Sequence, residues 1–133
     1  MQLPKHIADR IHQVVATTRQ VGGGNIDEEA AKYGGVALMG TLGCIWLLRP
    51  DGTLWEVDDD FGRPLAPLAP EWHWGAIRCG VERLPWLADA LPRRPMGATD
   101  CPQCRGTGTF PPERGSAGVL CDRCCSRGWL APV

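Results

Sequence analysis

Two cysteine pairs near the end of the chain restrict its folding more than any other feature. The stretches CPQCRGTG (101–108) and CDRCCSRG (121–128) each begin with two cysteines that are separated by two residues. This spacing forms a tight turn that directs both sulfurs at one ion, and four thiolates complete the shell of a structural zinc site. The pattern therefore predicts one Zn²⁺ per chain. Its predicted ligands are Cys101, Cys104, Cys121 and Cys124.

The residues around these cysteines favour a fold that depends on metal. Gly106 and Gly108 permit the positive φ angles that let the chain curl round an ion with its amides directed at sulfur. Residues 101–133 contain few large apolar side chains, so metal binding has to offset the entropy that they lose on folding. The spacing also fits an iron site of the same geometry, or redox-active cysteine pairs that hold no metal.

The first stretch matches the C-x-x-C-x-G-x-G motif of the cysteine-rich zinc domain in DnaJ co-chaperones and related small zinc proteins. The second stretch departs from that motif, because Ser126 stands where its first glycine belongs. The chain thus resembles this family, over about residues 101–133 only. In the family two such motifs bind one zinc, so the resemblance implies that the four cysteines share one ion.

The resemblance does not extend to the activity of a co-chaperone. A J domain carries a His-Pro-Asp signature, and no histidine of this chain precedes a proline. Stimulation of an ATPase is therefore not implied. The resemblance implies instead a protein-binding or oligomer-forming zinc module, as in small bacterial proteins that use this motif to assemble and to bind a partner.

The cysteine count and the apolar segments indicate the compartment. The chain has seven cysteines, an odd number, and residues 1–20 lack the apolar segment that export requires. The longest apolar run, around residues 36–48, is too short to span a bilayer. We therefore expect a cytoplasmic protein without a membrane partner, in which disulfides are disfavoured.

The other three cysteines have no predicted metal role, although a redox role stays open for each. Cys125 follows Cys124 directly, and its use as a ligand would abandon the C-x-x-C turn, so we expect a spare thiol. Cys44 lies in a predicted strand and is expected to be a small core residue. Cys79 forms a conceivable catalytic pair with His73, which no local motif supports.

Residues 1–95 are predicted to form an α+β domain with a small antiparallel sheet and two or three helices, and residues 96–133 a C-terminal zinc knuckle or ribbon. Apolar residues recur at helical spacing over residues 6–20, and the glycines 22–24 are expected to end that helix. Asn25 or Asp27 can cap a second short helix.

A hairpin is predicted where Cys44–Leu48 can pair with Thr53–Val57 around the turn Arg49–Gly52. Trp46 and Trp55 would then pack on a shared face. Beyond the hairpin the sequence predicts an extended segment (61–70), a short strand (71–80) and a final helix (81–92).

Composition and motifs favour a binding protein over an enzyme. The formal net charge of −1 gives the chain no overall attraction for nucleic acid. It has no GxSxG, HExxH, P-loop or dinucleotide motif, so no catalytic residue is predicted. We expect a partner protein or self-association, as for an adaptor, a chaperone-like subunit or an immunity or antitoxin-type binder. The predicted interaction surface comprises Trp72, His73, Trp74 and Trp129.

Two other functions remain open at this stage. Zinc ribbons often hold nucleic acid, and six arginines lie between residues 93 and 127. The charge of a four-thiolate zinc site opposes that function, because the site adds two negative charges. A small enzyme with an unrecognised active site is the further alternative.

Overall fold

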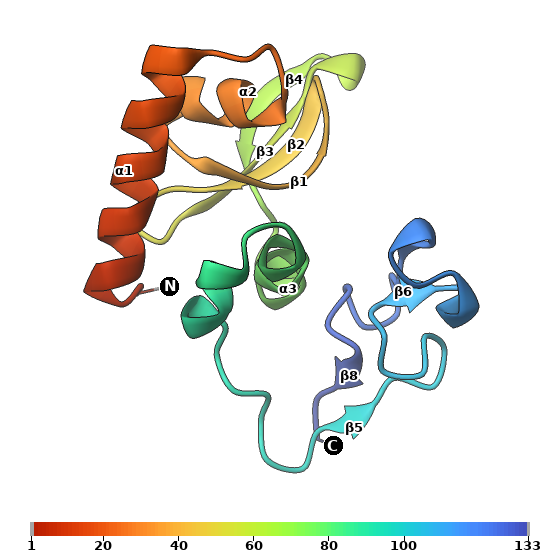
Figure 1. Cartoon of the computed structure of the whole chain (residues 1–133). Coiled ribbons are helices and arrows are strands. Elements are labelled where there is room, and N and C mark those ends of the chain that lie inside the picture. Colours follow the sequence, from red (N-terminus) through yellow and green to blue (C-terminus); the bar gives the residue numbers. More distant parts are fainter. Residues whose placement is uncertain (1, 133) are drawn as a thin grey trace.

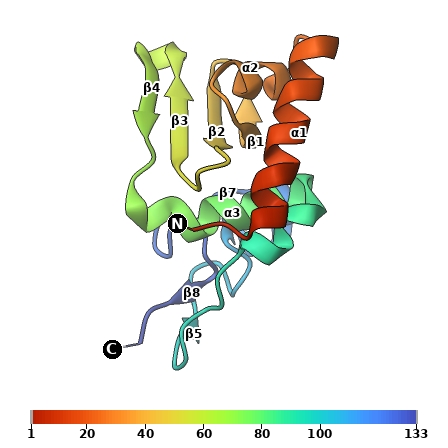
Figure 2. The ribbon, with the colours of Figure 1, turned by 90° about the vertical axis from the view of Figure 1, so that its left-hand side faces the viewer.

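The computed structural model describes residues 2–132 of the chain, except the side chains of residues 60, 116 and 117. Its class is α+β, as predicted: three α-helices accompany a four-stranded antiparallel sheet, and a cysteine cluster lies near the C-terminus. The helices are α1 (Lys5–Val21), α2 (Ile26–Lys32) and α3 (His73–Arg83). In both views α3 lies between the sheet and the C-terminal segment (Figures 1 and 2).

The first two helices follow the predicted pattern closely. Ile7, Ile11 and Val15 form the buried stripe of α1, and Gly22, with a positive φ of 74°, is the cap that follows its last residue. Asn25 caps α2, because its side-chain oxygen accepts the backbone N–H groups of Asp27 and Glu28. Three acidic residues in the first turn of α2 suit the positive end of the helix dipole.

The sheet has the strand order β1-β2-β3-β4, with every neighbouring pair antiparallel. The strands are β1 (Val36–Thr41), β2 (Cys44–Leu48), β3 (Leu54–Asp58) and β4 (Arg63–Pro67). The predicted hairpin is therefore present as β2 and β3. The extended proline-rich segment supplies β4, where Pro64 and Pro67 suit an edge strand.

Two apolar clusters hold this part of the molecule together. The larger cluster joins α1, α3 and one set of strand residues, with Ile11, Leu38 and Ile77 fully buried. The smaller cluster joins Ala30 of α2 to Ile45 and Leu47 of β2. Alternate residues of β1, β2 and β3 enter different clusters, as the period of two in a strand requires.

That alternation shows that the predicted pairing of Trp46 and Trp55 is wrong. Trp46 lies opposite Glu56 in the hairpin, and Trp55 lies opposite Leu47, so the two indoles point to opposite faces. Trp46 packs against Trp72 instead, with ring centroids 5.6 Å apart. The prediction that Cys44 is a core residue is also wrong, because its side chain is exposed at the start of β2.

The segment after the sheet is helical where a strand was predicted. Residues 71–80 belong to a 3-10 turn, η2 (Pro70–Trp72), and to α3. The final helix predicted over residues 81–92 is wrong in its bounds, since α3 ends at Arg83 and a second 3-10 helix, η3 (Pro85–Ala90), follows it. The remaining 3-10 helices are η1 (Asp59–Phe61) and η4 (Pro112–Ala117).

The C-terminal segment consists of two very short ladders. β5 (Thr99–Asp100) pairs with β8 (Trp129–Leu130), and β6 (Thr109–Phe110) pairs with β7 (Val119–Leu120). Each ladder joins a strand beside the first cysteine pair to one beside the second pair. The two cysteine turns are thereby brought face to face.

Candidate metal centre

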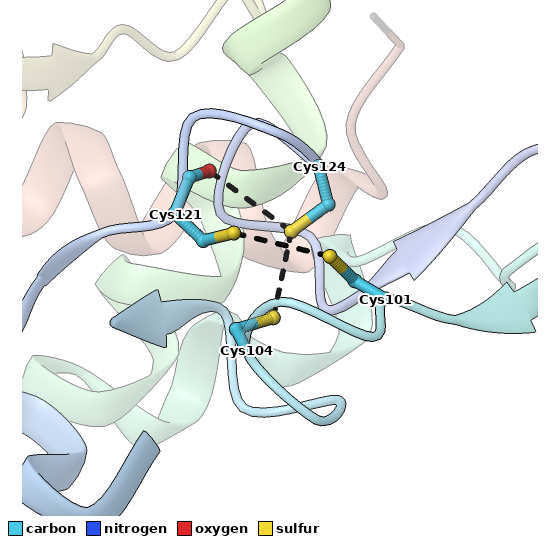
Figure 3. A group of neighbouring side chains, drawn as sticks. All are labelled: Cys101, Cys104, Cys121 and Cys124. Carbon is cyan, nitrogen blue, oxygen red and sulfur yellow. Dashed lines mark hydrogen bonds between the residues drawn. The ribbon is translucent and has the colours of Figure 1, made fainter. Parts of the chain in front are cut away.

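Four cysteine sulfurs converge between the two ladders (Figure 3). The Sγ atoms of Cys101, Cys104, Cys121 and Cys124 all lie within 4.8 Å of one another, and all four side chains are fully buried. The Sγ atoms of Cys101 and Cys121 are 3.9 Å apart, and those of Cys104 and Cys124 are 3.7 Å apart. These separations are far longer than a disulfide bond and match sulfurs arranged around a shared ion. The cluster can therefore hold a metal ion.

The two cysteine turns have the same construction. The backbone N–H of Gly108 donates to the sulfur of Cys104, and the N–H of Gly128 donates to the sulfur of Cys124, each over 3.2 Å. Both glycines have a positive φ, near 80°, which brings their amides within reach of sulfur. A thiolate that accepts an amide hydrogen bond is stabilised in its charged form, as metal binding requires.

The turns are also joined to each other by backbone hydrogen bonds. The N–H of Cys101 donates to the carbonyl of Gly128 over 2.9 Å, and the N–H of Cys121 donates to the carbonyl of Gly108 over 3.0 Å. The first cysteine of each pair thus binds the final glycine of the other. This exchange gives the site an approximate twofold symmetry built from two motifs offset by 20 residues.

Ser126, which breaks the repeated pattern, has a specific set of contacts. Its φ is +62°, a conformation that glycine adopts more readily, and its side chain is fully buried. The hydroxyl donates to the carbonyl of Gly108 over 3.0 Å and accepts a hydrogen bond from the Arg78 guanidinium over 2.7 Å. The serine therefore links the second turn to the first turn and to α3.

Arg78 of α3 completes this link. Its Nε–H donates to the carbonyl of Ser126 over 2.6 Å, and its guanidinium lies so close to Gly108 that a Cβ there would come within 2.7 Å of it. Its other terminal nitrogen binds Glu82 one helical turn later, over 3.2 Å. One arginine thus contacts both cysteine turns from the helix beside them.

Close packing between α3 and the second turn accompanies these hydrogen bonds. A Cβ on Gly75 would lie 2.2 Å from the carbonyl oxygen of Cys125, so only glycine fits at this point of the helix. The residue before it, Trp74, meets Trp129 edge to face, with ring centroids 5.4 Å apart. The C-terminal segment is therefore seated on α3.

Without a cation, burial opposes ionisation of the cluster. Burial raises the pKa of Cys124 to about 12 and also raises the pKa of Cys121. Burial acts in the same direction at Cys104, but hydrogen bonds from Gly108 and the neighbouring thiols outweigh it and lower the pKa of that residue to about 7. One thiol ionises readily and two resist, so a bound cation is needed to stabilise several thiolates together.

The other cysteines lie outside this group. Cys125 is partly buried and contacts the carbonyl of Asp122 through sulfur over 3.9 Å. Cys79 lies on α3, with its sulfur 3.7 Å from the Ser126 hydroxyl, and burial raises the pKa of its thiol. His73 binds the carbonyl of Leu68 over 2.9 Å. The two members of the conceivable Cys–His pair thus make their hydrogen bonds with different partners.

The four residues of the predicted interaction surface do not form one exposed patch. Trp129 is only 6% exposed, because Trp74 packs on it and the Arg127 guanidinium lies 4.3 Å from its ring centroid. Trp72 packs on Trp46 of the strand β2 instead. Their use in binding a partner remains a prediction.

Comparison with known proteins gives no family, since no protein-family model, no curated protein and no solved structure matches this chain. Among residues 2–132, no helix combines the length and the apolar character needed to cross a bilayer. The residues around the cluster whose contacts the sequence did not predict are Arg78, Gly75 and Ser126. Only the last left a visible signal, as the serine that replaces a glycine of the motif.

Proposed function

We propose that this chain is a zinc-binding protein that acts by binding another protein or a second copy of itself. The observation that carries the proposal is the convergence of four fully buried cysteine sulfurs within 4.8 Å. Thiolates favour Zn²⁺, and four protein ligands in a buried site leave no position for a substrate, which is typical of structural zinc. A reducing, cytoplasmic location suits such a site because it keeps the thiols available.

The same four cysteines support a similarity between this module and the zinc domain of DnaJ co-chaperones. Each pair lies in a tight turn, and the last glycine of each motif directs its amide at a cysteine sulfur. We take this module to be a zinc knuckle of that type, without the J domain. Its proposed task is to hold a surface for a partner, as in an adaptor, a chaperone-like subunit or an immunity-type binder.

Exposed apolar side chains favour a partner at the β6–β7 ladder. Phe110 and Val119 lie opposite each other in the ladder, and they are 43% and 70% exposed. Such side chains lose contact with water when a partner covers them. β6 follows the first cysteine turn and β7 precedes the second, so a metal that joins the two turns would hold this surface in place.

Metal analysis of purified protein tests the zinc site. We expect one zinc per chain, and its loss in Cys104→Ser and in Cys121→Ser. Cys44→Ser is the matched control, because Cys44 is exposed and outside the cluster. Stoichiometric zinc in both of the first two variants would show that the cluster is not the site.

Native mass spectrometry and co-purification from the protein's own cell test the partner. The proposal predicts a defined complex that is weakened in a variant combining Phe110→Ser with Val119→Ser. Leu42→Ser serves as control, since Leu42 is 59% exposed in the loop between β1 and β2, away from the cysteine turns. A protein that stays monomeric and copurifies with nothing would contradict the proposed function.

Nucleic-acid binding has less support in the structure. Arg94 forms an ion pair with Asp100 over 2.8 Å, Arg105 forms one with Glu113, and Arg127 lies over Trp129. These contacts occupy arginines that would otherwise face phosphates. The test is binding to single-stranded and double-stranded DNA and RNA. An affinity that rises steeply as the salt concentration falls would favour this alternative over a protein partner.

A further inference from the structure

A cavity of about 490 Å³ opens between the main sheet and the C-terminal module. Leu38 and Met39 of β1 form one side of it, and Val119 and Leu120 of β7 form the opposite side. One face of α3 closes the space between them. The volume suits a small organic ligand, and such sites often lie where two parts of a protein meet.

The two sides of the cavity are apolar. Leu38 is fully buried beneath it, whereas Val119 at its rim is 70% exposed. Met39 and Cys79 add sulfur atoms, which adapt readily to the shape of an apolar ligand. A ligand in the cavity would remove the exposed face of Val119 from water, which stabilises the complex.

The charged side chains that line the cavity come from α3, and each of the two arginines among them is paired with a carboxylate. Arg78, Glu82 and Arg83 line it together. Arg78 forms an ion pair with Glu82 over 3.2 Å, and Arg83 forms one with Asp27 over 2.9 Å, so both guanidinium charges are balanced by a carboxylate. An acceptor group beside Arg83 is therefore favoured by the N–H donors that Asp27 leaves unused, and a carboxylate accepts such hydrogen bonds strongly.

The hydrogen bonds of Arg83 leave a suitable pair of donors for such an anion. Its Nη1 donates to Asp27 over 2.9 Å and to the carbonyl of Ala37 over 3.0 Å, and its Nη2 donates to the other Asp27 oxygen over 3.1 Å. Among the residues that the structure describes, the Nε–H and the second Nη2–H have no acceptor. These two N–H groups are parallel and adjacent, and this fork matches the two oxygens of a carboxylate. The side chain is 33% exposed, so solvent-borne ligands reach it.

We propose that this cavity binds a small apolar molecule that carries a carboxylate, as a medium-chain fatty acid does. The carboxylate accepts both hydrogen bonds of the Arg83 fork, and the apolar chain lies between β1 and β7. This site shares Val119 with the proposed partner surface, so a partner that covers the β6–β7 ladder would compete with the ligand; decanoate titration and co-purification test the two proposals separately. Because β7 belongs to the C-terminal module, the ligand bridges the two parts of the molecule.

Titration of the full-length, metal-loaded protein with decanoate tests the site, with the ligand kept below its micelle concentration. We expect saturation at one decanoate per chain by calorimetry, and amide shifts in NMR spectra that centre on Met39, Cys79 and Leu120. Decanol has the same chain without the charge, so it should bind at least about tenfold more weakly. Equal affinity for the two ligands would overturn the role of the fork.

Two pairs of variants complete the test. Val119→Asp places a negative charge at the rim and should weaken decanoate binding at least about tenfold, whereas Val21→Asp, at the similarly exposed end of α1, should leave it unchanged. Arg83→Lys keeps the charge but lacks the fork and should remove most of the preference for decanoate over decanol. Absence of saturable binding, shifts outside the cavity, or full affinity in Val119→Asp would overturn the proposal.

Discussion

Ser126 combines an unfavourable backbone conformation with favourable hydrogen bonds, and the balance can be measured. Its positive φ costs about 1 kcal/mol relative to glycine, and its hydroxyl joins Arg78 to Gly108. Ser126→Ala keeps the strained backbone and removes the hydrogen bonds, including one to a charged group, so it should destabilise the protein by about 2 kcal/mol. Ser126→Gly removes both and should cost about half as much.

Chemical denaturation of the metal-loaded protein checks this order. Equal losses of unfolding free energy in the two variants would show that the backbone conformation carries no cost. An unchanged stability in Ser126→Ala would show that the hydroxyl does not stabilise the link between α3 and the two turns.

The cysteine pKa values predict how metal affinity depends on pH. Burial raises the pKa of Cys121, and raises that of Cys124 to about 12, so both carry protons near neutral pH when no metal is bound. A bound ion requires thiolates and displaces these protons, and the stability that metal supplies is therefore present at higher pH and lost as pH falls. With two protons released, affinity should fall at least about 100-fold per unit between pH 8 and pH 6.

Competition with a chromophoric zinc chelator across this range measures the slope. An affinity that changes by tenfold or less per pH unit would mean that fewer than two thiols are protonated in the metal-free protein. Cys44→Ser provides the control here too, since Cys44 lies outside the cluster and should not alter the slope.

At the scale of elements, the contact between α3 and the second cysteine turn depends on Gly75. Alanine favours a helix over glycine by about 1 kcal/mol, so helix propensity predicts that Gly75→Ala stabilises α3. A Cβ at this position would lie 2.2 Å from the carbonyl of Cys125, and we expect a net loss of about 1–3 kcal/mol because the turn has to move.

The matched control is Ala16→Gly on the exposed side of α1, where only propensity acts and a loss of about 1 kcal/mol is expected. Both substitutions should thus destabilise the protein, although one replaces glycine by alanine and the other replaces alanine by glycine. A stabilised Gly75→Ala variant, measured by thermal and chemical unfolding, would show that α3 and the second turn are not in close contact.

The sequence predicts the elements that have local signals, and Gly75 illustrates why α3 is not one of them. The helix α1, the β2–β3 hairpin and the two cysteine turns were predictable because their signals are local: an apolar stripe, a turn and a fixed spacing. The helix α3 was read as a strand because Trp72, His73 and Trp74 alternate and two glycines lower its helix propensity. Those glycines serve contacts distant in sequence, Gly75 with Cys125 and Gly80 with the side chain of Leu38.

The candidate site likewise contains residues that the sequence predicts and residues that it does not. Its four sulfurs follow from the C-x-x-C spacing, and they are the whole cluster among the residues that the structure describes. Arg78 gave no signal, because its partner in the second turn, Ser126, lies 48 residues further along the chain and is reached only when α3 and that turn meet. The register of the hairpin likewise decides the faces on which Trp46 and Trp55 lie. A register shifted by one residue would have put both indoles on the same face.

At the scale of the whole molecule, the contacts on α3 determine how far the effect of metal loss extends. Removal of the metal takes away the energy that orders residues 96–133, whose ladders are only two residues long. The larger apolar cluster of α1, α3 and the sheet contains no residue of that segment, so its core should survive. The face of α3 that carries Trp74, Gly75 and Arg78 should lose its cover.

Hydrogen–deuterium exchange before and after chelation tests this expectation. Protection should disappear across residues 96–133 and decrease moderately along α3, while β1–β3 and α1 retain it. The decrease along α3 distinguishes a C-terminal segment that packs on the helix from one that is only linked to it by the chain. A segment without contacts to α3 would leave hydrogen exchange in the helix unchanged. Equal loss of protection throughout the chain would instead mean that the sheet itself requires the metal, and that the contacts through Arg78 and Ser126 make the protein one cooperative unit.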